Sequence, residues 1–245
     1  MPGPASPLPH AHREIVSFVR RSTRMSESQV RNWDAHHATW VVPLAHRATS
    51  TSVADGQLFD QDVVWGRTAP LWLEIGTGNG EACVAIAGRH PEVNYLGFEV
   101  FKPSVASALG LVAREGLGNV RLAEVDGVDA LRHWIPSGSV DRLITFFPDP
   151  WHKARHHKRR LVNPTTAELI ADRLRPGGSW HLATDWEDYA VHMREVLDDR
   201  TDLVNAYADT GGWAPRPDER PVTRFEQRGL DAGRTIRDLV YVRAS

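Results

Sequence analysis

From Leu71 onward, short apolar runs alternate with longer amphipathic segments. The apolar runs that we expect to form strands are 71–75, 95–99, 120–125, 141–147, 179–184 and 236–243. The segments between them that we expect to form helices are 81–89, 102–115, 128–134, 165–174 and 186–197. Strands that alternate with helices in this way predict the α/β class, in which a mostly parallel sheet is covered by helices on both faces.

The residues before this pattern are less regular. Residues 1–12 contain four prolines and few apolar side chains, so we expect a disordered Pro-rich tail. Residues 13–40 show scattered helical spacing, with Ser26 as an expected N-cap and Gln29 three residues later. Because no linker-like break follows, we expect residues 13–245 to form a single domain with a helical and basic N-terminal segment.

Carboxylates recur where the expected strands end. The acidic residues at or just past these ends are Glu74, Glu99, Asp126, Asp149 and Asp185. Because the carboxyl ends of parallel strands share one edge of a sheet, and ligands bind outside that edge, we expect the five carboxylates to lie along one candidate site.

The first expected strand leads into a glycine-rich turn, residues 76–80, with glycines at Gly76, Gly78 and Gly80. Glycines let backbone N–H groups approach a ligand, but this spacing differs from the Gly-x-Gly-x-x-Gly of dinucleotide sites. Glu99 could accept hydrogen bonds from both hydroxyls of a ribose, which NAD and S-adenosylmethionine both contain. Glu74 would repel a pyrophosphate but suit a sulfonium or ammonium group, so the residues favour S-adenosylmethionine. The alternative interpretation is a plain tight turn whose neighbouring acidic residues lie at the protein surface.

A second constraint comes from the fourth expected strand, which ends in Pro148-Asp149-Pro150. Because proline fixes φ and disfavours helix in the residue before it, we expect Asp149 in a stiff, extended loop. Residues 152–160 then contain five Lys/Arg and three His. A carboxylate at a strand mouth beside a basic segment suits an enzyme that acts on nucleic acid, whereas a turn beside a solvated face is the simpler alternative.

The formal net charge of −2 offers no general attraction to nucleic acid, so any affinity has to come from local patches. The first patch is residues 153–160, and the second, which could equally be a solvated helix end, contains Arg20, Arg21 and Arg24. No run of 18 apolar residues and no signal-peptide segment occurs, so we expect a cytoplasmic protein without a membrane partner. The single Cys83 excludes an internal disulfide and fits core packing. Histidines inside basic runs are usually solvated, so we expect no metal.

Several motifs occur together in an order that resembles one known family. They are Leu73-Glu74-Ile75-Gly76-x-Gly78-x-Gly80, Gly97-Phe98-Glu99-Val100, Phe146-Phe147-Pro148-Asp149-Pro150-Trp151-His152-Lys153-x-Arg155-His156-x-Lys158-Arg159-Arg160, Ala183-Thr184-Asp185-Trp186 and Thr223-Arg224-Phe225-Glu226-x-Arg228-Gly229. Together they resemble the single-subunit bacterial tRNA (guanine-N7-)-methyltransferases, from about Phe18 to the last residues. The glycine turn alone is typical of the wider class I methyltransferase superfamily, which has a Rossmann-like sheet.

The resemblance implies transfer of a methyl group from S-adenosyl-L-methionine to N7 of guanosine 46 in the tRNA variable loop, with no obligate protein partner. It implies cofactor binding by Glu74, Gly76, Gly78, Gly80, Glu99, Asp126 and Asp149, of which Asp149 is also the expected catalytic residue. It implies substrate contacts by Lys153, Asp185, Thr223, Arg224, Phe225 and Glu226, and RNA binding by Arg155, His156, His157, Lys158, Arg159 and Arg160. The chain departs from the family pattern at Thr77, Asn79, Gly127 and His157, which concerns details of cofactor packing.

Guanine N7 already has an exposed lone pair, so methyl transfer needs alignment rather than a base. We therefore expect Asp149 to orient the guanine or to hold the methionine ammonium. Asp185 could share the guanine edge or cap the helix expected at Trp186. We expect residues 223–226 to form a loop that folds back over the site, with Phe225 packed and Glu226 polar.

Three rival interpretations remain. A methyltransferase acting on an exocyclic amine would have a related Pro-containing turn, but the interposed Asp149 and the basic block oppose it. An NAD-dependent oxidoreductase is opposed by the glycine spacing and Glu74. A non-catalytic RNA-binding protein is opposed by the full set of strand-end carboxylates.

Overall fold

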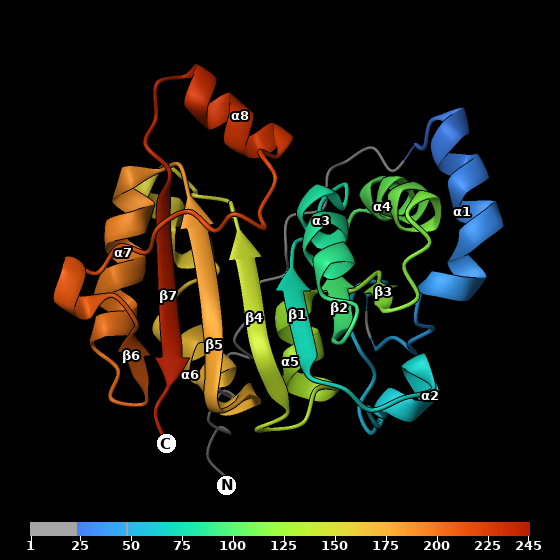
Figure 1. The fold of residues 1–245 in the computed structure, drawn as a ribbon, viewed down its shortest axis with the longest axis horizontal. Helices are drawn as coiled ribbons and strands as arrows, with labels where there is room; N and C mark the ends of the chain where they lie inside the picture. Colours follow the sequence, from blue (N-terminus) through green and yellow to red (C-terminus); the bar gives the residue numbers. More distant parts are fainter. Residues whose placement is uncertain (1–23, 48) are drawn as a thin grey trace, which may run out of the picture.

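Seven strands form one sheet in the order β3-β2-β1-β4-β5-β7-β6 (Figure 1). The structure is a computed structural model in which residues 24–47 and 49–245 are described. The strands are β1 (Leu71–Ile75), β2 (Asn94–Phe98), β3 (Val120–Ala123), β4 (Val140–Phe146), β5 (Leu174–Thr184), β6 (Leu203–Asn205) and β7 (Arg237–Arg243). The first five are parallel to one another, and only β7 and its partners pair antiparallel. The expected mostly parallel sheet is confirmed.

Helices cover both faces of this sheet (Figure 1). The α-helices are α1 (Glu27–Trp40), α2 (Gln61–Trp65), α3 (Glu81–Arg89), α4 (Lys102–Arg114), α5 (Gly127–His133), α6 (Pro164–Arg173), α7 (Glu187–Asp198) and α8 (Arg224–Asp231). Two short 3₁₀ helices are η1 (Ala154–Arg159) and η2 (Ala208–Thr210). Among the described residues, no helix is both long and apolar enough to cross a membrane.

Side chains alternate between two apolar cores because successive residues of a strand point to opposite faces of the sheet. Leu143 of β4 packs with Leu131 of α5 and Ile170 of α6 in one core. Its neighbour Ile144 packs in the other core, with helices α3 and α4. Cys83 lies in this second core and is fully buried, as expected.

The start of α1 confirms the expected N-cap. Ser26 Oγ accepts from the backbone N–H of Gln29 at 3.3 Å, and Gln29 Oε1 accepts from the N–H of Ser26 at 2.8 Å. This capping box satisfies two amide groups that a helix start otherwise leaves unpaired. The expected tail, residues 1–12, and the arginines Arg20 and Arg21 lie outside the described residues.

Strand β5 differs from the expectation. It begins at Leu174, five residues before the strand expected over 179–184, so it includes Pro176-Gly177-Gly178, and its register with β4 shifts between Leu174 and Ser179. Between β6 and α8 the chain contains the short η2 and then crosses the front of β7, β5 and β4 as an irregular segment (Figure 1). It then enters α8, which lies above the carboxyl ends of β4 and β5 (Figure 1).

Candidate active site

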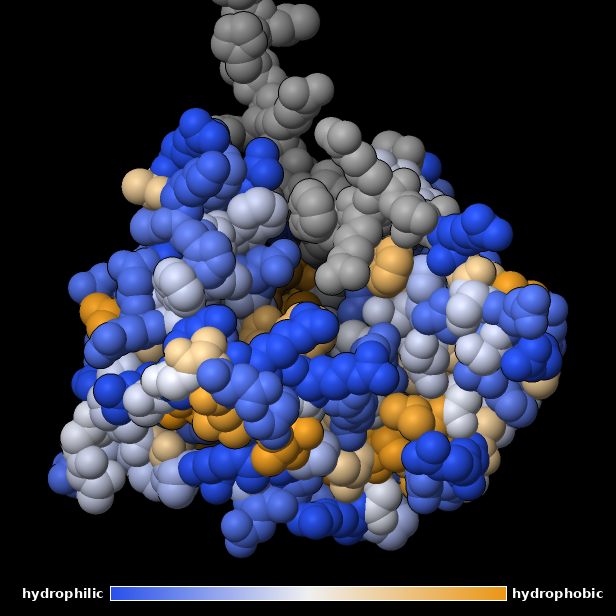
Figure 2. Space-filling view, turned by 90° about the horizontal axis from the view of Figure 1, so that it is seen from above, coloured by the Kyte–Doolittle hydropathy of each residue, from blue (hydrophilic) through white to orange (hydrophobic). Residues whose placement is uncertain are grey.

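A cavity of about 1500 Å³ lies at the carboxyl ends of the parallel strands. Figure 2 looks down on this edge of the sheet and shows a hollow with apolar side chains at its bottom and hydrophilic residues around it. Because all five parallel strands end here, the sheet brings together loops that are far apart in the sequence.

Most of the expected site residues line this cavity. Those that do are Glu74, Gly76, Gly78, Glu99, Asp126, Asp149, Lys153, His156, Lys158, Arg159, Arg160, Thr223, Arg224 and Phe225. Those that do not are Gly80, Asp185, Arg155, His157 and Glu226. Four of the five strand-end carboxylates therefore share one cavity, and Asp185 lies outside its lining.

The glycine turn after β1 is tied to the end of β2 by Glu99. The N–H of Gly78 donates to Glu99 Oε2 and that of Phe101 donates to Glu99 Oε1, both at 2.9 Å. Gly76 and Gly78 have φ values of 82° and 53°, which lie in the left-handed region that glycine tolerates. Each carboxylate oxygen can accept more than one hydrogen bond, so Glu99 can still accept from a ligand hydroxyl. Burial raises the pKa of the Glu99 carboxyl, and the backbone amides oppose that shift.

Gly80 joins the glycine turn to α3 and packs closely against α4. It caps α3 with a φ of 86°, and a Cβ at this position would lie 2.7 Å from Ala108 Cβ and 2.9 Å from Ala108 Cα on α4. Only a residue without a side chain lets α3 and α4 approach so closely. Gly80 thus positions the glycine turn without lining the cavity.

Glu74 lies at the base of the cavity with only 2% of its surface exposed. Its Oε2 accepts a hydrogen bond of 2.8 Å from the Tyr95 hydroxyl. Burial raises the pKa of Glu74 to about 7, although the hydrogen bond from Tyr95 lowers it and the nearby Glu99 charge raises it further. A positively charged ligand would compensate for the burial of this carboxylate.

Asp126 closes the same side of the cavity from the end of β3. Its Oδ1 accepts from the N–H groups of Val128 at 2.9 Å and Asp129 at 3.1 Å, so it caps α5. These bonds fix the carboxylate at the cavity wall and satisfy two amide groups of the helix start.

Asp149 lies in a segment without helix or strand, as expected, and is exposed at the cavity. The loop has two non-glycine residues with positive φ, Phe147 at 52° and Trp151 at 47°. Such backbone costs about 1–3 kcal/mol per residue and persists only where the surroundings enforce it. One such contact is the 2.7 Å hydrogen bond from the Phe147 N–H to the carbonyl of Ala183 on β5. The Asp149 charge also adds to the raised pKa of Glu99, after burial, so the two carboxylates interact across the cavity.

The basic segment after this loop forms η1, with its cations displayed outward. Lys153, Arg155, Lys158 and Arg159 are exposed, and the Arg159 guanidinium lies 5.0 Å from the centre of the Trp151 ring. Partial desolvation and the surrounding cations lower the pKa of His156.

The prediction that Arg160 binds RNA has to be corrected, because its side chain is buried. It is only 2% exposed, and its guanidinium donates to the carbonyl of Pro150 at 2.9 Å and to the carboxylate of Asp188. It also lies over the Tyr189 ring at 4.8 Å. Because the charge is buried and already paired, Arg160 anchors the Asp149 loop to α7 rather than serving as an exposed phosphate contact.

The segment 223–226 was expected as a loop but forms the start of α8. Thr223 is the N-cap, and its Oγ1 accepts from the N–H of Glu226 at 3.2 Å. Phe225, expected to be packed, is 52% exposed, whereas Glu226 makes polar contacts as expected but is only 1% exposed. Glu226 pairs with Arg216 at 2.6 Å and with Arg220 at 3.2 Å, so its carboxylate is committed to the interior.

Asp185 has a different environment from the other strand-end acids. Its carboxylate pairs with Arg234 at 2.5 Å, beyond the end of α8. The alternative that it caps α7 is wrong, because the N-cap is Trp186 and has no side-chain cap bond. Gly229 of α8 packs so closely that a Cβ there would lie 2.8 Å from Asp185 Cβ. Asp185 therefore contacts α8 rather than the cavity.

Sequence reasoning missed several residues that build the site. Tyr95 supports Glu74, and the buried pair Arg220 and Asp238 supports α8. The available signal was Asp238 itself, a charged residue directly before the apolar run 239–242 of β7, because such residues are rarely buried without a partner. Within residues 24–47 and 49–245, no group of three or more His, Cys, Asp or Glu side chains could hold a metal ion.

Known proteins match this chain over most of its length. A family described as "Putative methyltransferase" matches residues 68–239. A tRNA (guanine-N(7)-)-methyltransferase of Cutibacterium acnes is 50% identical over 94% of this chain and 84% of that protein. Proteins of the same name from Pseudomonas putida and Burkholderia cenocepacia are 44% and 46% identical, over 94% and 95% of this chain and 91% and 86% of theirs. The solved 16S rRNA methyltransferase KamB superposes with a TM-score of 0.51 at 20% identity, over 82% of this chain and 100% of that one.

Proposed function

Because the chain belongs to the tRNA (guanine-N7-)-methyltransferase family, we propose that it methylates N7 of guanosine 46 in the tRNA variable loop, with S-adenosyl-L-methionine as methyl donor. The sheet has the class I methyltransferase fold that the sequence predicted. Methylation of tRNA at guanine N7 follows from the family, and the position within tRNA and the donor are the finer parts of the proposal.

One observation carries this proposal. A single cavity contains the buried Glu74, the glycine turn held by Glu99, and the exposed Asp149, with the exposed cations of η1 at its rim. Cofactor, base and phosphate contacts are then all within one site.

The residues fit S-adenosylmethionine. Glu99 has acceptor capacity for ribose hydroxyls, and the open backbone at Gly76 has no atom within 4 Å of where a Cβ would stand. The buried carboxyl of Glu74 fits a positively charged ligand, whereas a pyrophosphate would be repelled by it. When bound, S-adenosylmethionine supplies a methyl group activated by the sulfonium.

The residues of this chain act mainly by alignment. Asp149 accepts hydrogen bonds from the N1–H and N2–H₂ groups of guanine and so directs N7 into the cavity. It takes no proton, because N7 reacts through its lone pair. The purine becomes cationic as the methyl group arrives, and the carboxylate of Asp149 stabilises that charge. The exposed cations of η1 bind the phosphates beside the target nucleotide.

The proposal is tested with an unmodified tRNA transcript and methyl-labelled S-adenosylmethionine, followed by mapping of the labelled nucleoside. We expect 7-methylguanosine at position 46 and no label in a transcript with adenosine at that position. Label in N2-methylguanosine or N6-methyladenosine would contradict the reaction. 7-Methylguanosine at another position would contradict only the assignment of position 46.

Affinity for S-adenosylmethionine is expected to rise with pH because Glu74 has a raised pKa of about 7. The carboxyl is mostly neutral at pH 6 and mostly charged at pH 8, and only the charged form attracts the cationic cofactor. If the bound cofactor lowers this pKa well below 6, the dissociation constant falls by about tenfold between pH 6 and pH 8. Isothermal titration in buffers of different ionisation enthalpy measures both the affinity and the proton released. A Glu74→Gln variant keeps the acceptor for Tyr95 and should lose the pH dependence. If it keeps that dependence, another group is responsible.

The exposed and buried arginines of the basic block are expected to behave differently. Arg159→Ala should raise the KM for tRNA and lower the salt slope by about one, because one phosphate contact is lost. Arg160→Ala should instead lower Tm, because it leaves the Asp188 partner and the Pro150 carbonyl without their donor.

The matched control is Arg175→Ala, which also removes an exposed charge, at the start of β5 and at the opposite edge of the sheet. It should leave the tRNA salt slope unchanged. A salt slope for Arg159→Ala equal to that of the wild-type protein would remove η1 from the RNA interface.

A further inference from the structure

A buried cluster of charged residues lies beneath α8. Arg220, Glu226 and Asp238 are all between 1% and 4% exposed. Arg220 donates to both oxygens of Asp238, at 2.6 and 3.0 Å, and to Glu226 at 3.2 Å. Arg216 donates to both oxygens of Glu226, at 2.6 and 3.4 Å. Two cations and two anions balance, which a buried cluster requires for stability.

This cluster is part of a longer buried network. Asp238 accepts from His181 at 2.9 Å, and Arg142 lies 3.2 Å from the other ring nitrogen of His181. Because arginine only donates, His181 Nδ1 is the acceptor, and the proton lies on Nε2 facing Asp238. Burial and the two flanking arginines lower the pKa of His181, although Asp238 opposes the shift, so the ring is neutral. Asp238 Oδ1 therefore accepts from His181 Nε2 and from Arg220, and Asp238 Oδ2 accepts from Arg220 alone among these donors.

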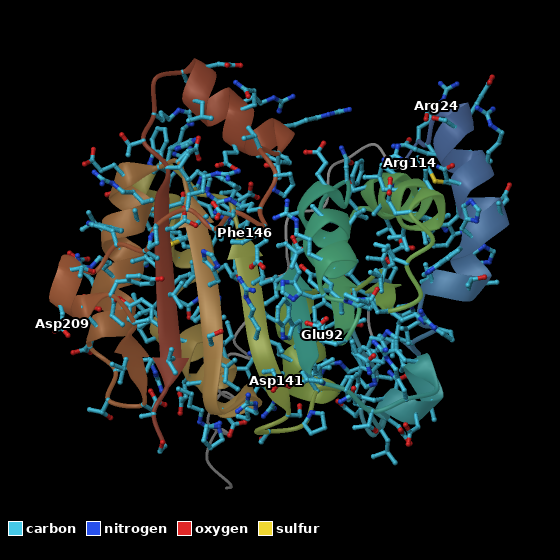
Figure 3. The ribbon with its side chains drawn as sticks, in the orientation of Figure 1. Arg24, Glu92, Arg114, Asp141, Phe146 and Asp209 are labelled. Carbon is cyan, nitrogen blue, oxygen red and sulfur yellow. The ribbon has the colours of Figure 1, made fainter. Side chains whose placement is uncertain are left out.

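The cluster joins α8 to the Asp149 loop. Glu226 lies in the first turn of α8, three residues after the N-cap Thr223. The Arg220 guanidinium lies 4.9 Å from the ring centre of Phe146 and 5.6 Å from that of Phe147. Figure 3 shows Phe146 at the upper end of β4, below the segment that leads into α8. One buried guanidinium thus contacts the helix above the cavity and the residues that lead into Asp149.

Outside the cluster, α8 also packs against Asp185 through Gly229 and contacts α3 through Arg224. The Arg224 N–H donates to Glu81 of α3 at 2.8 Å, but the Arg224 side chain is 75% exposed. Exposed pairs of this kind contribute little because solvent screens them. Phe225 extends from this turn to the cavity, and its Cε2 would lie 3.9 Å from a Cβ on Gly78. Displacement of α8 would therefore move residues that line the cavity.

We propose that Glu226 and Arg220 are positioning residues that hold α8 over the cavity in fixed relation to Asp149. This rests on the proposed function, since the reaction that they align is the methylation of tRNA. Glu226 acts through the arginines rather than by touching the substrate, because its carboxylate is buried and outside the cavity lining. Arg216, also outside that lining, belongs to the same positioning unit.

The test compares Glu226→Gln, which removes the charge at nearly constant shape, with Arg216→Ala, which removes a partner that does not line the cavity. Both are expected to lower kcat for tRNA by roughly tenfold, because small misplacements at a site reduce the rate steeply. The dissociation constant and stoichiometry of S-adenosylmethionine should stay within twofold, which shows that the folded fraction is intact. Hydrogen exchange of amides 224–231 should become faster in both variants, and Arg216→Lys should recover part of kcat.

The outcomes separate positioning from direct contact. Positioning is rejected if Arg216→Ala matches wild type while Glu226→Gln loses activity with α8 amides still protected, because Glu226 would then touch the substrate. It is also rejected if neither variant changes kcat. If Glu226→Gln does not fold, Arg216→Ala alone decides, since its side chain is 37% exposed and its loss leaves Glu226 paired with Arg220. An inactive wild-type protein would contradict the proposed function, whereas the exchange measurement would still report whether the cluster holds α8.

Discussion

Asp149→Ala is expected to lower kcat for tRNA methylation by about 100- to 1000-fold, the loss typical of removing one aligned electrostatic contact in an active site. The side chain is exposed in its loop, so Tm should change by less than a few degrees. Rapid-quench measurement with labelled cofactor gives kcat, and thermal unfolding gives Tm.

Cofactor titration decides how Asp149 acts. If it orients the guanine, the dissociation constant of S-adenosylmethionine stays close to the wild-type value in Asp149→Ala. If it holds the methionine ammonium, that constant rises together with the loss of kcat. Asp149→Asn is the matched variant, because it keeps the shape and one acceptor. Full turnover by Asp149→Asn, with cofactor and tRNA still bound, would show that the carboxylate has no part in the reaction.

Gly80→Ala is expected to destabilise the protein by about 3 kcal/mol, from a left-handed backbone that alanine disfavours and a clash with α4. The clash is with backbone, since the new Cβ would lie 2.9 Å from Ala108 Cα. For a chain of this length, 1 kcal/mol corresponds to about 2–4 °C, so Tm should fall by about 6–12 °C. Affinity for S-adenosylmethionine should fall as well, because α3 and the glycine turn move together.

Gly116→Ala provides the matched control. Gly116 has a φ of 64°, also in the left-handed region, but a Cβ there would have no atom within 4 Å. It should cost only about 1 kcal/mol, or about 2–4 °C, from the backbone conformation alone. Equal decreases in Tm for the two variants would show that the contact with Ala108 does not contribute to the destabilisation.

The central sheet was predictable from the sequence because parallel strands buried on both faces appear as continuous apolar runs. The run 71–75 matches β1 to the residue, and the other parallel strands were found with only their ends displaced. β6 was missed because Leu203–Asn205 is too short to show a period. α8 was missed because its sequence is mostly polar, and its start depends on the Thr223 cap and on ion pairs with a distant segment.

The candidate site was predicted better in its location than in the roles of its residues. The topology alone places Glu74, Glu99, Asp126 and Asp149 on one cavity. A motif, however, contains both residues that could touch a ligand and residues that hold others in place. Arg160 and Glu226 are buried because of Asp188 and Arg220, partners that no local pattern within the motif identifies. Burial of a single charge is decided by tertiary contacts.

The placement of β7 has a consequence for synthesis of the protein on the ribosome. β7 is the last strand in the sequence but lies inside the sheet, between β5 and β6. Until residues 237–243 leave the ribosome, β5 has an open edge that can pair with another chain. Asp238 arrives with the same strand, so until then Arg220 lacks one of its two buried carboxylate partners. The nascent chain can therefore complete this sheet and the cluster beneath α8 only after residues 237–243 have been made, later than all the other strands of the sheet.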